Sequence, residues 1–255
     1  MTKSKLAGQV SIIIPVFNEE QYVCQVIDRV LLRPEPGEII IIDDASSDGT
    51  KQQLETYKDN PRVKLLFHDI NQGKGAAVTY GISSATLPYI LIQDADFEYD
   101  TADYPSVLAP LVEGKAEVVY GSRFMGTPGR VRYFRHEMGN KFLTFVSNVF
   151  TDIHLSDMET CYKAFKREVI QNINLSSKRF GIEVEFTAKI AKSRRLNIYE
   201  VPISYNPRRY NEGKKITWKD GISALYHIVK INMFENRQAF YKKPWDDILG
   251  PPKDY

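Results

Sequence analysis

Three carboxylates lie within five residues of one another after the apolar run YILIQ: Asp94, Asp96 and Glu98. Carboxylates at this spacing repel one another unless a cation or several hydrogen-bond donors neutralise them, and ligand sets made only of oxygen favour Mg²⁺ or Mn²⁺. Because Mg²⁺ keeps part of its water shell and is usually completed by substrate phosphates, the motif predicts a metal that carries a phosphorylated ligand. The alternative is a solvated acidic turn that caps the following helix, since D-x-D alone is a common tripeptide.

A second apolar run, EIIIID, also ends in acids, at Asp43 and Asp44. Asp48 in the same segment is suited to capping the helix that follows. Asp44 stands directly after the run, where an acidic residue can accept hydrogen bonds from a ribose hydroxyl or a base N–H group. Two acidic strand ends together favour the metal and nucleotide interpretation over two unrelated turns.

The segment NQGKG, residues 71–75, places two glycines around Lys74 at the start of a helix-sized run. One interpretation puts Lys74 and the helix N-terminus beside the phosphates of a nucleotide, and the other is a simple glycine-rich turn. The segment does not match G-x-x-x-x-G-K-[ST], and no G-x-G-x-x-G follows a strand-like run. The sequence therefore supports neither nucleoside-triphosphate hydrolysis nor dinucleotide redox chemistry.

Short β-branched runs alternate with helix-sized segments along the first 120 residues. Continuous apolar runs of this kind are typical of strands covered on both faces, so the alternation predicts an α/β fold with a doubly wound, mainly parallel sheet. The predicted strands are residues 10–17, 38–43, 63–67, 89–93, 118–121, 161–165 and 197–203, and the predicted helices are 19–32, 48–59, 75–85, 103–112, 138–150, 181–192 and 218–234. Because ligands bind beyond the carboxyl ends of such strands, we expect the two acidic motifs to meet at one edge of the sheet.

The composition is that of an ordinary globular protein, with 255 residues, 43% hydrophobic and 26% charged. These proportions exclude collagen, coiled coil and wholesale disorder, and a net charge of +2 is too weak a field to indicate nucleic-acid binding. Cys24 and Cys161 fit neither a disulfide framework nor a zinc site, so we expect reduced thiols in a cytoplasmic protein. The N-terminus lacks the apolar region of a signal peptide, and no run approaches the roughly 20 residues of a membrane-spanning helix.

A basic segment follows the predicted strand at 118–121, with a single acid, Glu137, among its charged residues. Its potential cations are Arg123, Arg130, Arg132, Arg135, His136 and Lys141. Arg123 and Arg135 are expected to bind an anionic acceptor, whereas Arg130 and Arg132 are interpreted as part of a solvated loop. The apolar residues between 138 and 150 have helical spacing, which suits a helix on a membrane surface as well as a core helix. A second stripe, at residues 218–229, is interpreted as core.

Eight segments occur in the order seen in family 2 glycosyltransferases: SIIIPVFNEE, IIDDASSDGT, NQGKGAA, DADFEYD, VVYGSRF, DMETCYKAF, FGIEVE and RRYNEGKKITWKDG. Over residues 10–234 the chain resembles most closely the branch like dolichyl-phosphate mannose synthase. The resemblance implies a GT-A fold, a sugar donor linked to GDP or UDP, a divalent metal, Mg²⁺ or Mn²⁺, and inversion at the anomeric carbon. We expect one domain over residues 1–236, with a nucleotide-binding half (1–120) and an acceptor-binding half (121–236), and a loosely held tail at 237–255.

The resemblance also implies roles for individual residues. The three carboxylates of the first motif would hold the metal on the diphosphate, with Glu98 the least certain ligand because some relatives carry Gln there. Arg123 and Arg208 would face phosphates, with Arg209 as the alternative to Arg208. The residues expected to bind the nucleotide sugar are Pro15, Phe17, Glu19, Asp44, Lys74 and Asp94.

The acceptor decides whether the reaction needs a base. A hydroxyl acceptor must lose a proton to a positioned group, for which Asp157 is the first candidate and Glu159 the second. The alternative for Asp157 is that it orients an arginine or a backbone turn. A lipid phosphate, with a second pKa of about 6, is already largely ionised at pH 7 and needs arginines more than a base.

We therefore expect a metal-dependent inverting transfer of one hexose from a nucleotide sugar to a polyprenyl phosphate at the cytosolic membrane face. The Q-x-x-R-W signature of processive synthases is absent, which favours a single transfer. A soluble glycosyltransferase acting on a glycan or small-molecule hydroxyl is the main alternative. A nucleotidyltransferase would carry a glycine-rich phosphate loop near its first strand, and the acids and arginines argue against a non-catalytic sensor. The donor base, the sugar, the lipid and the oligomeric state are left open.

Overall fold

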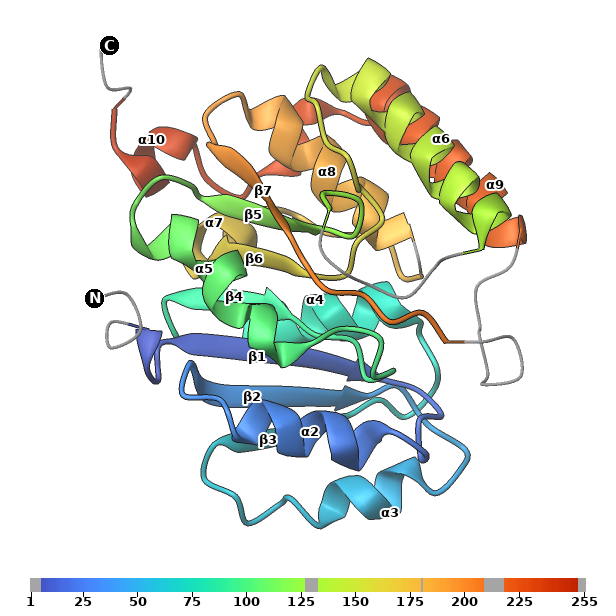
Figure 1. Cartoon of the computed structure of the whole chain (residues 1–255). Coiled ribbons are helices and arrows are strands. Elements are labelled where there is room, and N and C mark those ends of the chain that lie inside the picture. Colours follow the sequence, from blue (N-terminus) through green and yellow to red (C-terminus); the bar gives the residue numbers. More distant parts are fainter. Residues whose placement is uncertain (1–5, 127–132, 180, 209–217, 252–255) are drawn as a thin grey trace.

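The computed structural model of the chain describes residues 6–126, 133–179, 181–208 and 218–251. Its strands form one sheet in the order β3-β2-β1-β4-β6-β5-β7 (Figure 1). Their bounds are β1 Val10–Val16, β2 Pro36–Asp43, β3 Val63–Phe67, β4 Tyr89–Ile92, β5 Val118–Ser122, β6 Lys163–Lys166 and β7 Ile198–Pro202. Neighbouring strands are parallel except for β6, which is antiparallel to both β4 and β5. The predicted α/β fold with a mainly parallel sheet is confirmed.

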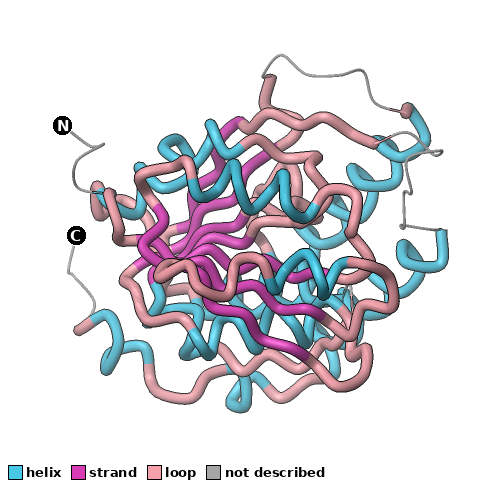
Figure 2. Tube along the Cα trace, turned by 90° about the horizontal axis from the view of Figure 1, so that it is seen from below, coloured by secondary structure: helices cyan, strands magenta, loops and turns pink. Residues whose placement is uncertain are grey.

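Helices cover both faces of this sheet (Figure 2). They are α2 Val23–Leu31, α3 Thr50–Glu55, α4 Lys74–Ser84, α5 Tyr104–Val112, α6 Phe134–Thr151, α7 Arg167–Asn172, α8 Gly181–Ser193, α9 Trp218–Val229 and α10 Trp245–Leu249, with short helices η1 Thr101–Asp103, η3 Lys230–Phe234 and η4 Arg237–Phe240. The sequence does not predict α7 and α10, because six and five residues are too few to show a helical period. Among the described helices, none is both long and apolar enough to cross a lipid bilayer.

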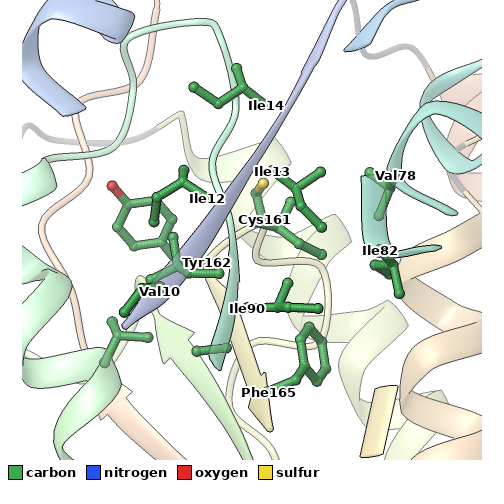
Figure 3. Packing of buried hydrophobic residues seen from close by; sticks show 14 of the residues in the cluster. Val10, Ile12, Ile13, Ile14, Val78, Ile82, Ile90, Cys161, Tyr162 and Phe165 are labelled. Carbon is green, nitrogen blue, oxygen red and sulfur yellow. The ribbon is translucent and has the colours of Figure 1, made fainter. Parts of the chain in front are cut away.

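The centre of the sheet is buried on both sides. Four successive isoleucines of β2, residues 39–42, have no exposed surface. Since successive side chains of a strand point to opposite faces, both faces must be covered, which is why these runs are continuous rather than alternating. Figure 3 shows the same arrangement around β1, where Ile13 packs towards Val78 and Ile82 of α4 while Ile12 and Tyr162 lie on the other side.

A second apolar cluster lies between α6, α8 and α9, and it includes Leu143, Met158, Val184 and Ile228. Helices α6 and α9 run side by side at the outside of this layer (Figure 1). The core interpretation of the 218–229 stripe is right for Ile228, which has no exposed surface, and wrong for Ile222, which is 57% exposed. This layer gives the second half of the chain a small apolar core of its own, separate from the core of the sheet.

Residues 237–251 are packed against the rest of the molecule, so the expectation of a loosely held tail is wrong for this stretch. Phe240 and Trp245 are buried, and the Tyr241 hydroxyl donates a hydrogen bond of 2.6 Å to the carbonyl oxygen of Lys189 on α8. Burial of two aromatic side chains and partial burial of a third within six residues outweighs the entropy of ordering such a short segment.

Candidate active site

The acidic motifs meet at one edge of the sheet, where β1, β2 and β4 end. Val16 of β1 pairs with Asp43 of β2, and Ile13 of β1 pairs with Ile92 of β4, so the residues that follow these strands emerge together. This is the carboxyl edge, where ligands of open α/β sheets bind. Pro15 lies at the end of β1 and is partly buried, and Phe17 follows it with 38% of its surface exposed.

Asp44 holds the turn that carries Lys74. Its carboxylate accepts backbone N–H bonds from Gln72 and Gly73, at 2.9 and 2.7 Å, and lies 2.7 Å from Nδ1 of His68. The residue is 2% exposed, so both oxygens are already engaged inside the protein. The structure thus gives Asp44 a positioning role at the expected nucleotide edge, and direct contact with a nucleoside stays a prediction.

The glycines of the NQGKG turn are required by close packing against residues 177–179. A Cβ at Gly73, whose φ is +95°, would lie 2.4 Å from the Lys178 carbonyl oxygen, and a Cβ at Gly75 would lie 2.1 Å from that of Ser177. Backbone oxygens cannot move aside as flexible side chains do. The turn therefore docks α4 against the segment before α8.

We expect Gly75→Ala to lower the free energy of unfolding by about 1–3 kcal/mol, the usual cost of overpacking a filled interior. Thermal and urea denaturation would measure the loss. Gly139→Ala is the matched control, since Gly139 lies within α6 and a Cβ there meets nothing within 4 Å. Alanine at that helical position should be neutral or stabilising. Equal stability of the two variants would contradict the close packing.

Lys74 joins two acids from different elements. Its Nζ lies 2.8 Å from Asp94 Oδ1 and 3.5 Å from Glu183 Oε1 on α8. Glu183 also accepts a hydrogen bond from the fully buried Lys163 of β6. Burial alone would raise the pKa of Asp94 and lower that of Lys74, but the attraction between them outweighs burial, so the pKa of Asp94 is lowered and that of Lys74 is raised. Lys74 thus keeps Asp94 ionised.

Arg208 lies among three carboxylates. Its Nη1 and Nη2 are 3.1 and 3.2 Å from the two oxygens of Glu19, its Nη2 is 3.4 Å from Asp96 Oδ2, and its Nε is 3.6 Å from Glu98 Oε1. Burial, followed by repulsion from Asp94 and Glu98, raises the pKa of Asp96 to about 8 even though Arg208 opposes the shift. The cluster of Asp94, Asp96 and Glu98 therefore carries more negative charge than the neighbouring cations neutralise. Arg209, the sequence alternative to Arg208, lies outside the described residues.

Two of the three expected metal ligands fit a divalent cation. Asp94 and Asp96 offer carboxylate oxygens. The repulsion from Asp94 and Glu98 that raises the pKa of Asp96 would be relieved by one more positive charge, such as a divalent cation. Glu98 is instead occupied, because the Tyr205 hydroxyl donates to one oxygen and the Arg208 backbone N–H donates to the other at 2.9 Å. Among the described residues no three acids, histidines or cysteines form a ready ligand set, so the expected three-carboxylate site is not formed. One or two carboxylates plus substrate phosphates suffice for Mg²⁺.

Asp157 is sequestered by Arg123. It has no exposed surface, and its oxygens accept bonds from Arg123 Nε and Nη2, both at 2.7 Å, and from the Arg123 backbone N–H at 2.9 Å. Burial alone would lower the pKa of Arg123, but the Asp157 carboxylate outweighs it and raises that pKa. A carboxylate buried in this way has no access to an acceptor proton, so the geometry favours the alternative that Asp157 orients an arginine.

The guanidinium of Arg123 borders a pocket at the start of α6. The lining residues are Arg123, Phe124, Tyr133, His136, Glu137, Asn140, Tyr205 and Pro207. Arg135, the other expected acceptor-binding residue, is exposed on α6 and does not line this pocket. Of the expected pair, the structure therefore brings Arg123 alone to the pocket, and residues 127–132 lie outside its description.

Several residues that hold the expected site residues in place were not identified from the sequence. Lys163 and Glu183 complete the Lys74 network, Tyr205 binds Glu98, and Glu200 of β7 accepts the backbone N–H groups of Ser156 and Asp157 at 3.0 Å. A signal for Lys163 and Glu183 does exist, because each is a charged residue inside an apolar run. Such residues are almost never fully buried unless they are paired.

Comparisons with known proteins identify the family of this chain. The model of the family "Glycosyl transferase family 2" matches residues 11–173. Glycosyltransferase AglJ of Haloferax volcanii is 32% identical over 78% of this chain and 63% of its own length. Dodecaprenyl-phosphate galacturonate synthase of Rhizobium johnstonii is 24% identical over 87% of this chain and 64% of its own length. A UDP-N-acetylglucosamine–dolichyl-phosphate N-acetylglucosaminyltransferase of Methanococcus voltae is 25% identical over 87% of this chain and 95% of its own.

The chain spans about half to two-thirds of the length of the first curated relatives that it matches. Among solved structures, glucosyl-3-phosphoglycerate synthase from Mycobacterium tuberculosis, in a complex with Mn²⁺, UDP and glucosyl-3-phosphoglycerate, superposes with a TM-score of 0.69 at 16% identity, over 92% of this chain and 83% of that one. At this identity the likeness shows the fold, and the expected GT-A fold is confirmed. The matched family model, the order of motifs and the shared fold show that the chain belongs to glycosyl transferase family 2.

Proposed function

We propose that this chain transfers one hexose from a nucleotide-diphosphate sugar to a polyprenyl phosphate, with inversion and with the help of a divalent metal. The observation that carries the acceptor class is the burial of Asp157 beneath Arg123, since the first candidate for a base is thereby removed. A phosphate acceptor needs no base, because it is already an anion at pH 7. Two of the relatives are named for polyprenyl-phosphate acceptors, which supports the same class.

The acidic edge would bind the donor. A divalent cation bound there would supply positive charge to the departing diphosphate. Asp94 and Asp96 would hold it, while Lys74 keeps Asp94 ionised and Arg208 offers a cation to the diphosphate oxygens. Arg123 would bind the acceptor phosphate in the pocket beside α6, with Asp157 fixing its orientation. Fixed charges of this kind stabilise a transition state without reorganisation during the reaction.

The lipid part of the acceptor would lie along an exposed apolar stripe on α6. The stripe residues and their exposed fractions are Phe134 76%, Met138 48%, Phe142 55%, Phe145 65% and Val149 65%. They recur every three or four residues, so they share one face of the helix. Helix α9, which runs beside α6 (Figure 1), carries the exposed residues Ile222 and Tyr226. The acceptor pocket opens at the start of this helix, so a membrane-embedded chain could reach it.

Replacing Phe142 and Phe145 by serine is expected to weaken binding to liposomes by at least about tenfold, since two aromatic side chains lose their apolar contact with lipid. Thermal stability should change little, because both side chains are exposed in the free protein. Flotation with phosphatidylglycerol liposomes would measure the effect. Leu32→Ser is the control, because Leu32 is 84% exposed but lies after α2, away from the stripe. Unchanged liposome binding by the double variant would contradict the membrane contact.

A matrix of donors and acceptors tests the proposed reaction. UDP-glucose, UDP-N-acetylglucosamine and GDP-mannose are each incubated with dodecaprenyl phosphate and Mg²⁺ or Mn²⁺, and sugar-lipid products are detected by mass spectrometry. At least one combination should yield a lipid-linked hexose, and EDTA should abolish it. If products form only with glycan or small-molecule hydroxyls, the acceptor proposal fails and the soluble-transferase alternative replaces it.

A further inference from the structure

Glu159 has a buried carboxylate oxygen with no hydrogen-bond partner. It lies in the segment between α6 and β6, and among the described residues nothing donates to its Oε1. The hydroxyl oxygen of the next residue, Thr160, is also buried, and it too has no hydrogen-bond partner in the described part of the chain. Native proteins rarely leave buried polar atoms unsatisfied, so two adjacent ones call for a ligand that supplies the missing bonds.

The carboxylates near Glu159 are already neutralised by cations. Asp157 is paired with Arg123, and Glu183 is paired with both Lys163 and Lys74. Among the described residues, Glu159 takes part in no such pair. Burial, followed by repulsion from Glu183, raises the pKa of Glu159 to about 7. A carboxylate oxygen that is buried without an ion pair or hydrogen bond is costly to keep, and a neutral hydrogen-bond donor is a partner that relieves the cost.

Glu159 lies within electrostatic range of both Arg123, at the pocket beside α6, and the Lys163–Glu183 pair that contacts Lys74. The charged groups that act on it are Arg123 and Asp157 beside the pocket, and Lys163 and Glu183 beside Lys74. Glu183 in turn is 3.5 Å from Lys74, which is bonded to Asp94. A sugar that leaves a diphosphate held at Asp94 for a phosphate held at Arg123 would therefore pass near Glu159.

We propose that Glu159 binds the donor hexose, with its carboxylate accepting a hydrogen bond from a ring hydroxyl and Thr160 contributing a second polar contact. This inference rests on the proposed function, since it needs a hexose donor at the acidic edge. Glu159 then acts in sugar selection and orientation, and it makes and breaks no covalent bond. Sites built to bind a hydroxyl reject analogues that lack it, because the site's own polar group is left unpaired.

The test compares binding of each nucleotide with and without its sugar. Affinities of UDP, UDP-glucose, GDP and GDP-mannose are measured by calorimetry with Mn²⁺ for the wild type, Glu159→Gln and Glu159→Ala. Both variants should bind the nucleoside diphosphates within about twofold of the wild type, while the ratio of the sugar-nucleotide Kd to the diphosphate Kd rises about tenfold. Glu117→Gln is the control, because Glu117 is buried and paired with Lys166 near the start of β5. It should leave the ratio unchanged.

Several results would overturn the assignment. An unchanged ratio in both variants would remove Glu159 from the hexose site. A fall in kcat with an unchanged ratio, recovered at high pH, would identify a general base instead. Glu159→Gln preserves shape, so it keeps the test valid if the alanine variant fails to fold. Failure of the wild type to bind any of the four nucleotides would overturn the proposed function itself, and the hexose assignment with it.

Discussion

Replacing Asp96 by asparagine is expected to lower kcat/KM by about a thousandfold while raising the melting temperature of the metal-free protein at pH 7. Activity falls because the variant loses a charged ligand at the diphosphate, where single stabilising groups are worth factors of about 100–1,000. Stability rises because the substitution removes a partly buried carboxylate that is repelled by Asp94 and Glu98. Steady-state kinetics and differential scanning fluorimetry measure the two effects.

The pH dependence of Asp96 has a defined sign. Its pKa of about 8 in the folded protein lies above its ordinary value. Between about pH 4 and pH 8, Asp96 is therefore protonated in the folded state and ionised in the unfolded chain. The contribution of Asp96 to stability therefore falls as the pH rises through this window. A metal ion binds the ionised form of Asp96, so below pH 8 metal binding releases a proton. The affinity for the metal therefore falls by up to about tenfold for each unit by which the pH is lowered. Affinity for Mn²⁺ with a nucleoside diphosphate that is flat from pH 6 to pH 8 would contradict this.

A matched control separates the Asp96 effect from a general change of charge. Asp59→Asn also removes one negative charge, but Asp59 is exposed in the turn after α3. It should leave kcat/KM and the pH dependence of metal binding as in the wild type. If the two variants behaved alike, the loss of activity by Asp96→Asn would reflect net charge rather than the site.

Arg123→Met is expected to lower the free energy of unfolding by about 3–5 kcal/mol and to abolish transfer to a phosphate acceptor. The substitution leaves Asp157 as an unpaired charge with no exposed surface, which is the costly way to break a buried ion pair. Urea denaturation measures the loss of stability, and transfer to dodecaprenyl phosphate, detected by mass spectrometry, measures the loss of function.

A double variant distinguishes the two roles of the pair. Arg123→Met combined with Asp157→Leu removes both charges, so much of the stability should return while transfer stays absent. Asp157→Asn alone should reduce activity without recovery at high pH, because its carboxylate orients Arg123 rather than accepting a proton. Recovery at high pH would restore the base hypothesis and with it a hydroxyl acceptor. Lys141→Met, which breaks an exposed pair with Glu137, should leave stability nearly unchanged.

Most elements could be predicted from local pattern, because continuous apolar runs and helical periodicity are properties of short windows. The isoleucine run at residues 39–42 predicts a strand covered on both faces, and it is one. The order of strands and the antiparallel direction of β6 could not be predicted, since pairing joins residues far apart in the chain. The packing of Phe240 and Trp245 was missed for the same reason.

By itself the sequence determined which residue types could do chemistry and at which strand ends they stand. Asp94 and Asp96 follow β4, as their spacing after an apolar run predicts, and Arg208, expected from the family resemblance, lies 3.4 Å from Asp96. Only the tertiary structure decided which other carboxylates are paired. Glu98 accepts a hydrogen bond from Tyr205, Asp157 is paired with Arg123, and one oxygen of Glu159 has no partner among the residues that the structure describes. The physical reason is that the charge state and availability of a carboxylate depend on burial and on cations within a few ångströms, which arrive from distant parts of the chain.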